Sequence, residues 1–407
     1  MNCRFCKSKL KIKFLDLGYS PLANDYPVTK IYNRKEKFYP LKTWFCEKCF
    51  LVQSQGFNKT SLLFNDKYTY FSSVSKSFSE HFKNYVIKIT KLLKLNKNSF
   101  IIEIGSNDGI LLKNFKNLKK NCLGIEPSKN TAKVCEKFGI KVVKKFFNFK
   151  LATSLSSKKA DLIIANNVFA HIPKINDTVK GLKKLLNREG CINIEFPHLL
   201  NLIKFKQFDT VYHEHFFYFS LTSVINIFNK YNLKIWKVDK VDTHGGSLRI
   251  YASHADDVKK VQNSVNNILS EEEKFGITKI ITYKKFQEKI KLNKIKILKY
   301  LEIEKKKKKK ICGFGAPAKA TTLINYYKLN ENTLGAVFDN SPSKIGKYIP
   351  GTNIPIIKPT EKNLKKFDII FIFAWNLKKE IINFIRNKIR KNIKIGILIP
   401  KLKILKL

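Results

Sequence analysis

Short runs of apolar residues alternate with helical patterns through the middle of the chain. The first four runs cover residues 100–104, 122–125, 161–165 and 191–196. Strands that are apolar on both faces and separated by helices are typical of a parallel sheet with helices on both sides. Two later runs, at 233–238 and 248–251, fit an antiparallel pair that ends this sheet. The pattern therefore predicts an α/β domain over residues 66–255.

The pattern changes on either side of this domain. Residues 1–65 are rich in turn residues. Residues 256–310 show a lysine-rich helical pattern that ends in a lysine run at 305–310. Such a run is usually solvated surface, with an anion-binding face as the alternative. Further apolar runs cover residues 311–315, 335–339, 368–374 and 393–399. They predict a second, smaller α/β domain after a helical linker, within residues 256–407.

Composition narrows the class of protein. The chain has 407 residues, of which 44% are hydrophobic, and this suffices for two or three packed domains. No apolar run approaches the roughly 18 residues that cross a bilayer. The first residues, Met1 to Cys6, lack the apolar segment of a secretory signal. We therefore expect a cytoplasmic protein with no membrane partner.

The formal net charge of +48 raises the question of a nucleic-acid partner. Of the 79 basic residues only six are arginine, and arginine is the residue that most often contacts phosphates and bases through paired hydrogen bonds. The lysines are spread through every segment rather than gathered in one stripe. We therefore predict no nucleic-acid partner. The positive charge is still compatible with a small anionic ligand such as a diphosphate. The sequence leaves the oligomeric state open.

Four cysteines form two Cys-x-x-Cys pairs, Cys3 with Cys6 and Cys46 with Cys49. Each such turn points two sulfurs at one point, and two turns complete the tetrahedral set of four sulfurs that zinc prefers. A redox Cys-x-x-Cys would need a βαβ context, which the pattern here lacks. We predict a structural zinc site, since four sulfurs leave no open position for catalysis.

A glycine-containing loop joins the run at 100–104 to a helical pattern. Its sequence is Glu103-Ile-Gly105-Ser-Asn107-Asp108-Gly109. The two glycines let the backbone turn tightly and approach a ligand closely. The loop is therefore the first candidate for binding a cofactor.

Glu126 follows the second apolar run, where a carboxylate can accept hydrogen bonds from both hydroxyls of an adenosine ribose. A dinucleotide enzyme would show Gly-x-Gly-x-x-Gly, whereas this loop is Glu-x-Gly-x-x-x-Gly. That spacing resembles motif I of class I SAM-dependent methyltransferases. Asn166 and Asn167 end the third run and match such a site. We predict SAM as the cofactor; NAD and a purely structural glycine turn are the alternatives.

A short segment after the fourth run gathers acid–base side chains. Its residues are Tyr212, His213, Glu214 and His215. Histidine can act as a base near neutral pH, and an adjacent acid can orient it. Metal binding and a structural role are the alternatives, although the two histidines are too close for the helical zinc pattern. His171 ends the segment after Asn166, and we interpret it as a second crevice residue or as a core histidine.

Eight motifs follow one another over residues 3 to about 376. They are the two cysteine pairs, Tyr70-Phe-Ser-Ser, the Glu103–Gly109 loop, Gly124-Ile-Glu-Pro, Asn166-Asn-Val-Phe-Ala-His-Ile, Tyr212-His-Glu-His, His244-Gly-Gly-Ser-Leu-Arg and Gly313-Phe-Gly-Ala-Pro-Ala-Lys. In this order the chain resembles the three-part family of sugar C-methyltransferases, which act on nucleotide-linked 4-keto deoxysugars.

The resemblance implies a zinc-binding domain (1–65), a class I SAM methyltransferase domain with a Rossmann-like fold (66–255) and a smaller Rossmann-like α/β domain (256–407). The family's catalytic base falls on His215, and its tyrosine and glutamate fall on Tyr212 and Glu214. Its other histidine falls on His171. The early tyrosine falls on Tyr70, with Tyr68 close enough to compete.

The reaction that the resemblance implies is methyl transfer to C3 of the sugar. A ketone at C4 makes the C3 proton removable, because the carbanion delocalises into an enolate. His215 would abstract the proton, and Tyr212, with Glu214 or His171, would contact the enolate oxygen or orient the base. The alternatives are O- or N-methylation of another metabolite, and a zinc-ribbon protein that binds nucleic acid.

Two further motifs are candidates for holding the substrate diphosphate. One is the turn at Gly313 and Gly315 with Lys319, which is equally interpretable as a structural turn between strand and helix. The other is His244-Gly-Gly246-Ser-Leu-Arg249. In both, backbone amides and a basic side chain could hold the diphosphate.

Overall fold

The computed structural model describes residues 1–55, 63, 76–389 and 392–407. These residues form two compact units, each made of segments that are distant in sequence. The first unit comprises Met1–Leu10, Cys46–His198 and Phe216–Thr278, and the second comprises Lys11–Phe45, Leu199–His215 and Lys279–Leu407. Tyr70 and Tyr68 lie outside the described residues. The domain limits at 65 and 255 stay a prediction.

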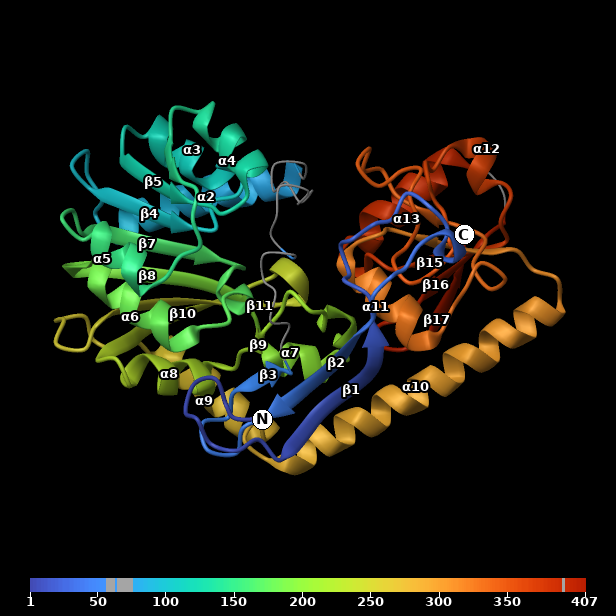
Figure 1. Ribbon diagram of the computed structural model, residues 1–407, viewed down its shortest axis with the longest axis horizontal. Helices are drawn as coiled ribbons and strands as arrows, with labels where there is room; N and C mark the ends of the chain where they lie inside the picture. The colour runs from blue at the N-terminus through green and yellow to red at the C-terminus, as the bar shows by residue number, and fades with distance from the viewer. Residues whose placement is uncertain (56–62, 64–75, 390–391) are drawn as a thin grey trace. The chain divides into compact units, whose positions relative to one another are not determined.

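The first unit is built on a seven-stranded sheet with the order β10-β11-β8-β7-β4-β5-β6 (Figure 1). Its strands are β4 (Phe100–Ile104), β5 (Asn121–Ile125), β6 (Lys141–Val143), β7 (Ala160–Asn166), β8 (Leu186–Pro197), β10 (Leu233–Val241) and β11 (Ser247–His254). Strands β6, β5, β4, β7 and β8 run parallel. Strand β11 pairs antiparallel with both β8 and β10. The predicted parallel sheet and its antiparallel end are confirmed, while the short β6 was not predicted.

The order of strands in this sheet reverses at β4. Glu103 of β4 pairs with Gly124 of β5 on one side and with Ile164 of β7 on the other. In an open α/β sheet, ligands bind outside the carboxyl ends of the strands at such a reversal. The loop after β4 and the ends of β5 and β7 therefore share the edge where a cofactor is expected.

The helices of the first unit cover this sheet. They are α2 (Lys76–Leu92), η3 (Phe169–His171), α3 (Ile110–Asn117), α4 (Lys129–Glu136), α5 (Phe149–Ser154), α6 (Ile175–Leu185), α8 (Leu221–Asn229), η5 (Thr243–Gly245) and α9 (Asn263–Phe275). Val86 of α2 and Phe115 of α3 share one core with Ile101 and Leu162 of the sheet. Because side chains alternate along a strand, the residues next to Ile101 face the opposite side. Helix α8 begins with a capping box at Ser220.

A short strand pair joins the cysteine-bearing segment to the rest of the first unit. Strand β3 (Val52–Ser54) follows the second cysteine pair and runs antiparallel to β9 (Phe217–Tyr218). All three residues of β3 are buried. This pairing anchors the segment that carries the cysteines.

The second unit contains a six-stranded sheet with the order β14-β13-β12-β15-β16-β17. Figure 1 labels three of its strands, β15, β16 and β17. Its strands are β12 (Ile311–Phe314), β13 (Val337–Phe338), β14 (Ile356–Ile357), β15 (Ile369–Ile372), β16 (Lys394–Ile397) and β17 (Lys403–Lys406). The first five run parallel, and β17 is antiparallel to β16. The order again reverses at the first strand along the chain, β12. The predicted second Rossmann-like α/β fold is confirmed.

The helices of the second unit include one that is much longer than the others. They are η1 (Ile31–Asn33), α7 (Leu199–Lys204), η4 (Phe208–Thr210), α10 (Ile280–Lys306), α11 (Ala318–Tyr327), α12 (Glu361–Leu364), η6 (Trp375–Leu377) and α13 (Lys378–Lys388). Buried residues recur every three or four positions along α10, which is the spacing of one helix face. Its lysines remain on the other faces, in line with the predicted solvated helix.

Helix α10 packs against a hairpin from the N-terminal part of the chain. The hairpin is formed by β1 (Ile12–Ser20) and β2 (Tyr39–Phe45), which run antiparallel. The ring of Phe14 lies 5.2 Å from that of Phe286 and 5.3 Å from that of Tyr283, measured between centroids. Aromatic contacts of this kind add to the free energy gained from burial. Among the helices of the described residues, none is long and apolar enough to cross a membrane.

Candidate functional site

The loop after β4 adopts the tight conformation that its glycines predict. Gly105 has φ +70° and Gly109 has φ +78°, in the left-handed region that favours glycine. A Cβ on Gly105 would lie 2.7 Å from Cγ2 of Val168, and one on Gly109 would lie 2.5 Å from Sγ of Cys135. The absence of side chains therefore lets this loop pass close to the segment after β7 and to α4.

Glu126 holds the loop from the end of β5. Its Oε2 accepts a hydrogen bond from the backbone N–H of Asn107 (2.9 Å), and its Oε1 accepts one from the backbone N–H of Ser128 (2.9 Å). Burial raises the pKa of this carboxyl group above its usual value, while these amide contacts oppose the rise. Each carboxylate oxygen has a second lone pair, so Glu126 can still accept hydrogen bonds from ligand hydroxyls.

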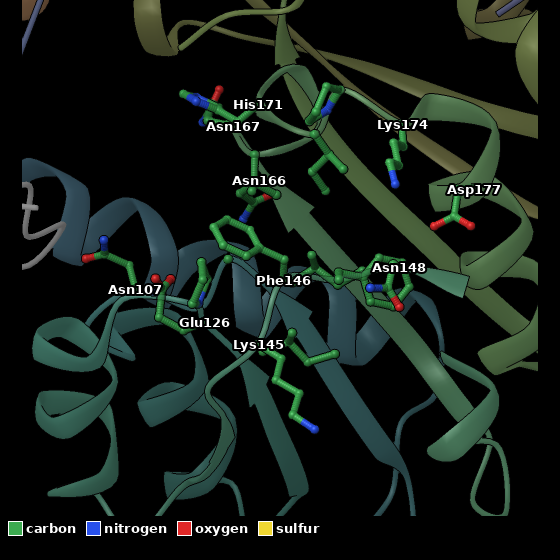
Figure 2. Close-up of a pocket in the computed structure, with 18 of the residues that line it drawn as sticks. Asn107, Glu126, Lys145, Phe146, Asn148, Asn166, Asn167, His171, Lys174 and Asp177 are labelled. Carbon is green, nitrogen blue, oxygen red and sulfur yellow. The ribbon is translucent and has the colours of Figure 1, made fainter. Parts of the chain in front are cut away.

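A cavity of about 540 Å³ opens beside this loop. Its lining includes Gly105, Asn107, Glu126, Asn166 and His171, all named as site residues from the sequence. Figure 2 shows Asn107 and Glu126 at one end of the lining and Asn148 and Asp177 at the other (Figure 2). The volume lies within the range of small-molecule and cofactor sites.

The side chain of Asn166 gives the lining an unsatisfied polar group. Both Nδ2 and Oδ1 are buried and have no hydrogen-bond partner among the residues that the structure describes. Buried polar groups are normally paired, so the amide is suited to a ligand with both a donor and an acceptor. Together with the carboxylate of Glu126 and the close approach allowed at Gly105, it fits a nucleoside-containing amino acid such as SAM.

Three predicted cofactor residues lie outside the lining: Glu103, Asp108 and Gly109. Glu103 and Asp108 are buried. Burial, with Asp108 and Glu126 nearby, raises the pKa of Glu103 well above its usual value. Glu103 thus lies beneath the loop, and Gly109 starts α3.

Sequence reasoning did not find the part of the pocket that follows β6. Lys145, Phe146, Phe147 and Asn148 all line the cavity. The side chain of Asn148 also caps α5 by accepting a hydrogen bond from Leu151 N–H (2.8 Å). Val142 and Val143 followed by a capping asparagine would have predicted a strand and a helix start here, but a three-residue strand leaves little periodicity.

Glu195, near the end of β8, connects several segments around the pocket. Its Oε1 accepts hydrogen bonds from Thr243 Oγ1 (2.6 Å) and Asn167 Nδ2 (3.2 Å), and its Oε2 accepts one from Arg249 Nη2. Burial opposes ionisation of Glu195, but contacts with His81, Arg249 and Thr243 outweigh it and lower the pKa below the usual value.

The predicted substrate motif at 244–249 therefore divides between two places in the first unit. His244 lines the cofactor cavity, and Gly246, with φ +104°, ends η5. Arg249 is buried, with its guanidinium 4.1 Å from the ring centroid of Tyr85 and bonded to Glu195. The arginine thus contacts protein groups beneath the pocket.

The four N-terminal cysteines meet in the first unit. The sulfur atoms of Cys3, Cys6, Cys46 and Cys49 all lie within 4.8 Å of one another. The Cys3–Cys49 and Cys6–Cys46 Sγ pairs are 3.6 and 3.5 Å apart. Zn–S bonds of about 2.3 Å in a tetrahedron give S–S edges of about 3.8 Å. The cluster therefore fits a zinc ion bound by four thiolates.

The predicted base belongs to the second unit. Nδ1 of His215 lies 2.8 Å from the backbone oxygen of Thr210. A carbonyl oxygen can only accept, so Nδ1 carries the proton in the neutral ring and Nε2 is the atom that can accept one. The ring of Tyr212 lies 4.1 Å from that of His215 between centroids. The structure thus brings two predicted catalytic residues together; His171 belongs to the first unit.

The two residues between Tyr212 and His215 are buried, unlike their half-buried neighbours. Burial lowers the pKa of His213 to about 4, so this ring is neutral near pH 7. Burial raises the pKa of Glu214 to about 7, and Asn24 Nδ2 donates to its Oε1 (2.6 Å). Of the two histidines, His215 is therefore the one whose side chain is only half-buried.

Lys319 lies in the first turn of α11 in the second unit. Its Nζ donates to Asn376 Oδ1 (2.6 Å) and lies 4.1 Å from the ring centroid of Trp375. Trp375 Nε1 in turn donates to Oδ2 of the buried Asp209 (2.6 Å). Burial lowers the pKa of Lys319 to about 8 and raises that of Asp209 to about 6. A half-buried cation thus stands at a helix N-terminus, where anions are favoured.

Comparison with known proteins agrees with this architecture. Family models match residues 3–64 as a putative zinc binding domain, 78–238 as a methyltransferase domain and 242–400 as a C-methyltransferase C-terminal domain. The C-methyltransferase NovU of Streptomyces niveus is 29% identical over 384 residues, which cover 94% of this chain and 91% of that protein. The chain is a SAM-dependent methyltransferase. The four-cysteine cluster lies within the segment that matches the putative zinc binding domain.

Solved structures resemble one part of the chain. A SAM-dependent methyltransferase from Clostridium acetobutylicum is 12% identical, with a TM-score of 0.35, over 43% of this chain and 92% of that chain. Magnesium protoporphyrin IX methyltransferase from Synechocystis is 13% identical, with a TM-score of 0.33, over 42% of this chain and 79% of that chain. The fold assignment rests on the strand order and the family models rather than on these likenesses.

Proposed function

We propose that the protein transfers a methyl group to C3 of a nucleotide-diphosphate-linked 4-keto deoxysugar. The observation that carries this proposal is the His215 ring, whose hydrogen bond to the Thr210 carbonyl leaves Nε2 as the proton acceptor. Methylation of carbon requires a base, because a C–H bond is not nucleophilic until the proton is removed. The C-methyltransferase domain match and the similarity to NovU support carbon as the acceptor.

In this proposal Nε2 of His215 takes the C3 proton, and the electron pair of the C–H bond moves into an enolate on the C4 oxygen. Tyr212, whose ring lies against that of His215, hydrogen-bonds the enolate oxygen or orients the base; a donor of this kind contributes roughly 3–4 kcal/mol. SAM, when bound, supplies the methyl group to the carbon. His215 then releases its proton to water.

Glu214 and His171 have supporting roles in the proposal. The raised pKa of Glu214, about 7, lets this buried group hold or release a proton near neutral pH. His171 lines the cofactor cavity, where it would contact the substrate beside the methyl donor. Tyr70, the remaining predicted catalytic residue, lies outside the described residues.

The diphosphate of the substrate is assigned to Lys319 in the same proposal. Its ammonium group stands at the N-terminus of α11, so charge and helix dipole act together on an anion. His244 and Gly246 would contact the substrate from the rim of the cavity. Arg249 is bonded to Glu195, so it would help to position His244 and Gly246 rather than contact the substrate itself.

The base is tested by proton exchange rather than by methyl transfer. In D2O, with a 4-keto sugar nucleotide and a SAM analogue that cannot donate its methyl group, the wild-type protein should exchange the C3 proton, as followed by NMR. His215→Ala should slow exchange by about 10²–10⁴-fold, whereas His254→Ala, at the end of β11, should not. Exchange at the wild-type rate in His215→Ala would show that the base is another group.

The substrate class is tested by SAM turnover against a panel of 4-keto sugar nucleotides. Turnover confined to that panel supports the proposal. An active protein that ignores every keto-sugar nucleotide but methylates other small metabolites on oxygen or nitrogen contradicts it.

A further inference from the structure

Gln53 is a fully buried glutamine whose side chain contacts the cysteine cluster. Its Nε2 donates to Sγ of Cys3 (3.2 Å), and its Oε1 accepts a hydrogen bond from the backbone N–H of Arg4 (2.9 Å). Outer-shell hydrogen bonds of this kind orient metal ligands and tune their electron density. One side chain thus ties both a zinc-ligand sulfur and the backbone beside it to β3.

Strand β3, which Gln53 ties to the cysteine cluster, pairs with β9. Gln53 pairs with Phe217, and Val52 pairs with Tyr218. The backbone N–H of Ser54 also donates to the carbonyl oxygen of Phe216 (2.9 Å). Strand β9 therefore has its position set by the strand that carries Gln53.

Phe216 links this strand pair to the segment that carries His171. Its backbone N–H donates to the carbonyl oxygen of Ala170 (2.8 Å), and its ring lies 5.4 Å from the guanidinium carbon of Arg4. Ala170 directly precedes His171, and Phe216 directly follows His215. The hydrogen bond therefore joins Phe216 to the residue that precedes His171.

We propose that Gln53 is a positioning residue that couples the zinc site to Phe216 and, through Ala170, to His171. Gln53 holds β3 against Cys3, and β3 holds Phe216 through the bond from Ser54 N–H. The amide of Phe216 in turn fixes the Ala170 carbonyl group and so the backbone at His171. A zinc ion held by the four cysteines would then help to fix the position of His171 in addition to stabilising the N-terminal segment. The catalytic part of this inference rests on the proposed function; the coupling from zinc to Phe216 does not.

Other contacts hold the cysteine cluster independently of Gln53. Asn176 Nδ2 donates to the carbonyl oxygens of Phe5 (2.9 Å) and Arg4 (3.2 Å), and Asn176 Oδ1 accepts from Tyr231 Oη (2.8 Å). Asn226 Nδ2 donates to the carbonyl oxygen of Cys49 (3.4 Å). A Gln53 variant should therefore still fold and bind zinc, so that coupling can be separated from stability.

The coupling is tested on zinc-loaded full-length protein by amide hydrogen exchange. Gln53→Ala should bind one zinc ion per chain but release it to a chelator about tenfold faster. Exchange of the Phe216 amide, followed in peptides that span 216–219, should accelerate about tenfold. Gln287→Ala is the matched control, because that glutamine donates one hydrogen bond to the Lys13 carbonyl oxygen in the second unit; it should leave both rates unchanged.

Gln53→Met guards against a folding defect in the alanine variant, since methionine fills similar volume but makes neither hydrogen bond. It should reproduce both accelerations. Wild-type exchange at Phe216 in zinc-loaded Gln53→Ala and Gln53→Met would overturn the coupling. This arm needs no substrate, so it decides the coupling even if the proposed function fails.

The catalytic part is tested with the keto-sugar nucleotide that the wild-type protein methylates. Both Gln53 variants, measured below their unfolding temperatures and with full zinc occupancy, should lose about tenfold in kcat while KM and the Kd for SAM change less than about twofold. A residue that only stabilises the fold would leave kcat per zinc-loaded molecule unchanged. That result, together with accelerated exchange at Phe216, would overturn the positioning of His171 while keeping the coupling from Gln53 to Phe216.

Discussion

The two Rossmann-like sheets of this protein build the same arrangement after their first strands. A glycine with positive φ follows each strand, Gly105 in the first unit and Gly315 in the second, with φ of +70° and +87°. An acid after the next strand accepts backbone N–H groups in both: Glu126 from Asn107, and Asp339 from Ala316 (2.7 Å). The topology therefore produces a glycine turn braced by an acid whether or not a cofactor binds there.

What differs is the space over each turn. The turn at Gly105 borders a cavity of about 540 Å³. The carbonyl oxygen of Ala316, in the second turn, accepts hydrogen bonds from Tyr26 Oη (2.6 Å) and Lys344 Nζ (2.8 Å). Side chains of the second unit thus bond to the backbone of its turn, whereas Gly105 and Asn107 of the first turn border the cavity. A glycine turn braced by an acid therefore predicts a ligand site only where no side chain of the same unit fills the space beside the turn.

Removing the two acids should produce the largest difference between the turns. Glu126→Ala is expected to weaken SAM binding about 100-fold, because a carboxylate that braces the loop and accepts ligand hydroxyls contributes roughly 1.5–3 kcal/mol through each charged hydrogen bond. Asp339→Ala should leave the Kd for SAM unchanged and lower only the stability of the second unit. Isothermal titration calorimetry measures the first effect and thermal unfolding the second. Equal losses of SAM affinity in both variants would contradict the comparison.

Substitution of the two glycines tests the same difference between the two turns. A Cβ at Gly105 would meet Val168 at 2.7 Å, and one at Gly315 would meet Cβ of Ala374 at 2.7 Å. Each alanine variant should lose about 1–3 kcal/mol of stability from the left-handed backbone and crowding, but only Gly105→Ala should also weaken SAM binding, by about tenfold. Gly346→Ala, with φ +83° and nothing within 4 Å of its Cβ, isolates the backbone cost. Tight SAM binding by Gly105→Ala would mean that the loop is not in contact with the ligand.

The buried Asp209 gives the second unit a pH dependence. Its folded pKa is raised from 3.8 to about 6 by burial, so the protonated form is favoured in the folded state. The stability that this provides is present below about pH 4 and is lost as the pH rises through about 6. Asp209→Asn should therefore raise the free energy of unfolding by up to roughly 3 kcal/mol at pH 8 and by little at pH 4.

Urea unfolding at the two pH values measures this difference. Asp25→Asn, an exposed aspartate of the same unit, is the control and should show no pH-dependent gain. A gain for Asp209→Asn that is the same at pH 4 and pH 8 would show that ionisation of Asp209 is not its source.

The smallest expected effect concerns Lys319. If the second turn serves the substrate diphosphate through this side chain, Lys319→Met should raise KM for the keto-sugar nucleotide about fivefold and leave the Kd for SAM unchanged. Steady-state kinetics and calorimetry measure the two quantities. An unchanged KM would leave the second unit's turn with a structural role only.

Much of the fold could be predicted from local pattern. Apolar runs such as 100–104 and 161–165 became buried strands, because a strand buried on both faces needs continuous apolar sequence. The hairpin of β1 and β2 and the three-residue β6 were missed, since short or half-exposed strands leave weak periodicity. The sequence also did not predict which segments make up each unit. Segments such as Lys11–Phe45 and Leu199–His215 belong to the second unit because of contacts with residues distant in sequence.

The same division applies to the site. By itself the sequence determined the glycine loop after β4, the acid after β5 and the four sulfurs, since backbone geometry and ligand chemistry restrict which residues can stand there. Only the tertiary structure decided that Thr210 sets the tautomer of His215, that Arg249 bonds to Glu195, and that Gln53 contacts Cys3. These depend on which donor meets which acceptor after packing. Gln53 and Cys3 are 50 positions apart in the sequence, so no local pattern predicts their contact.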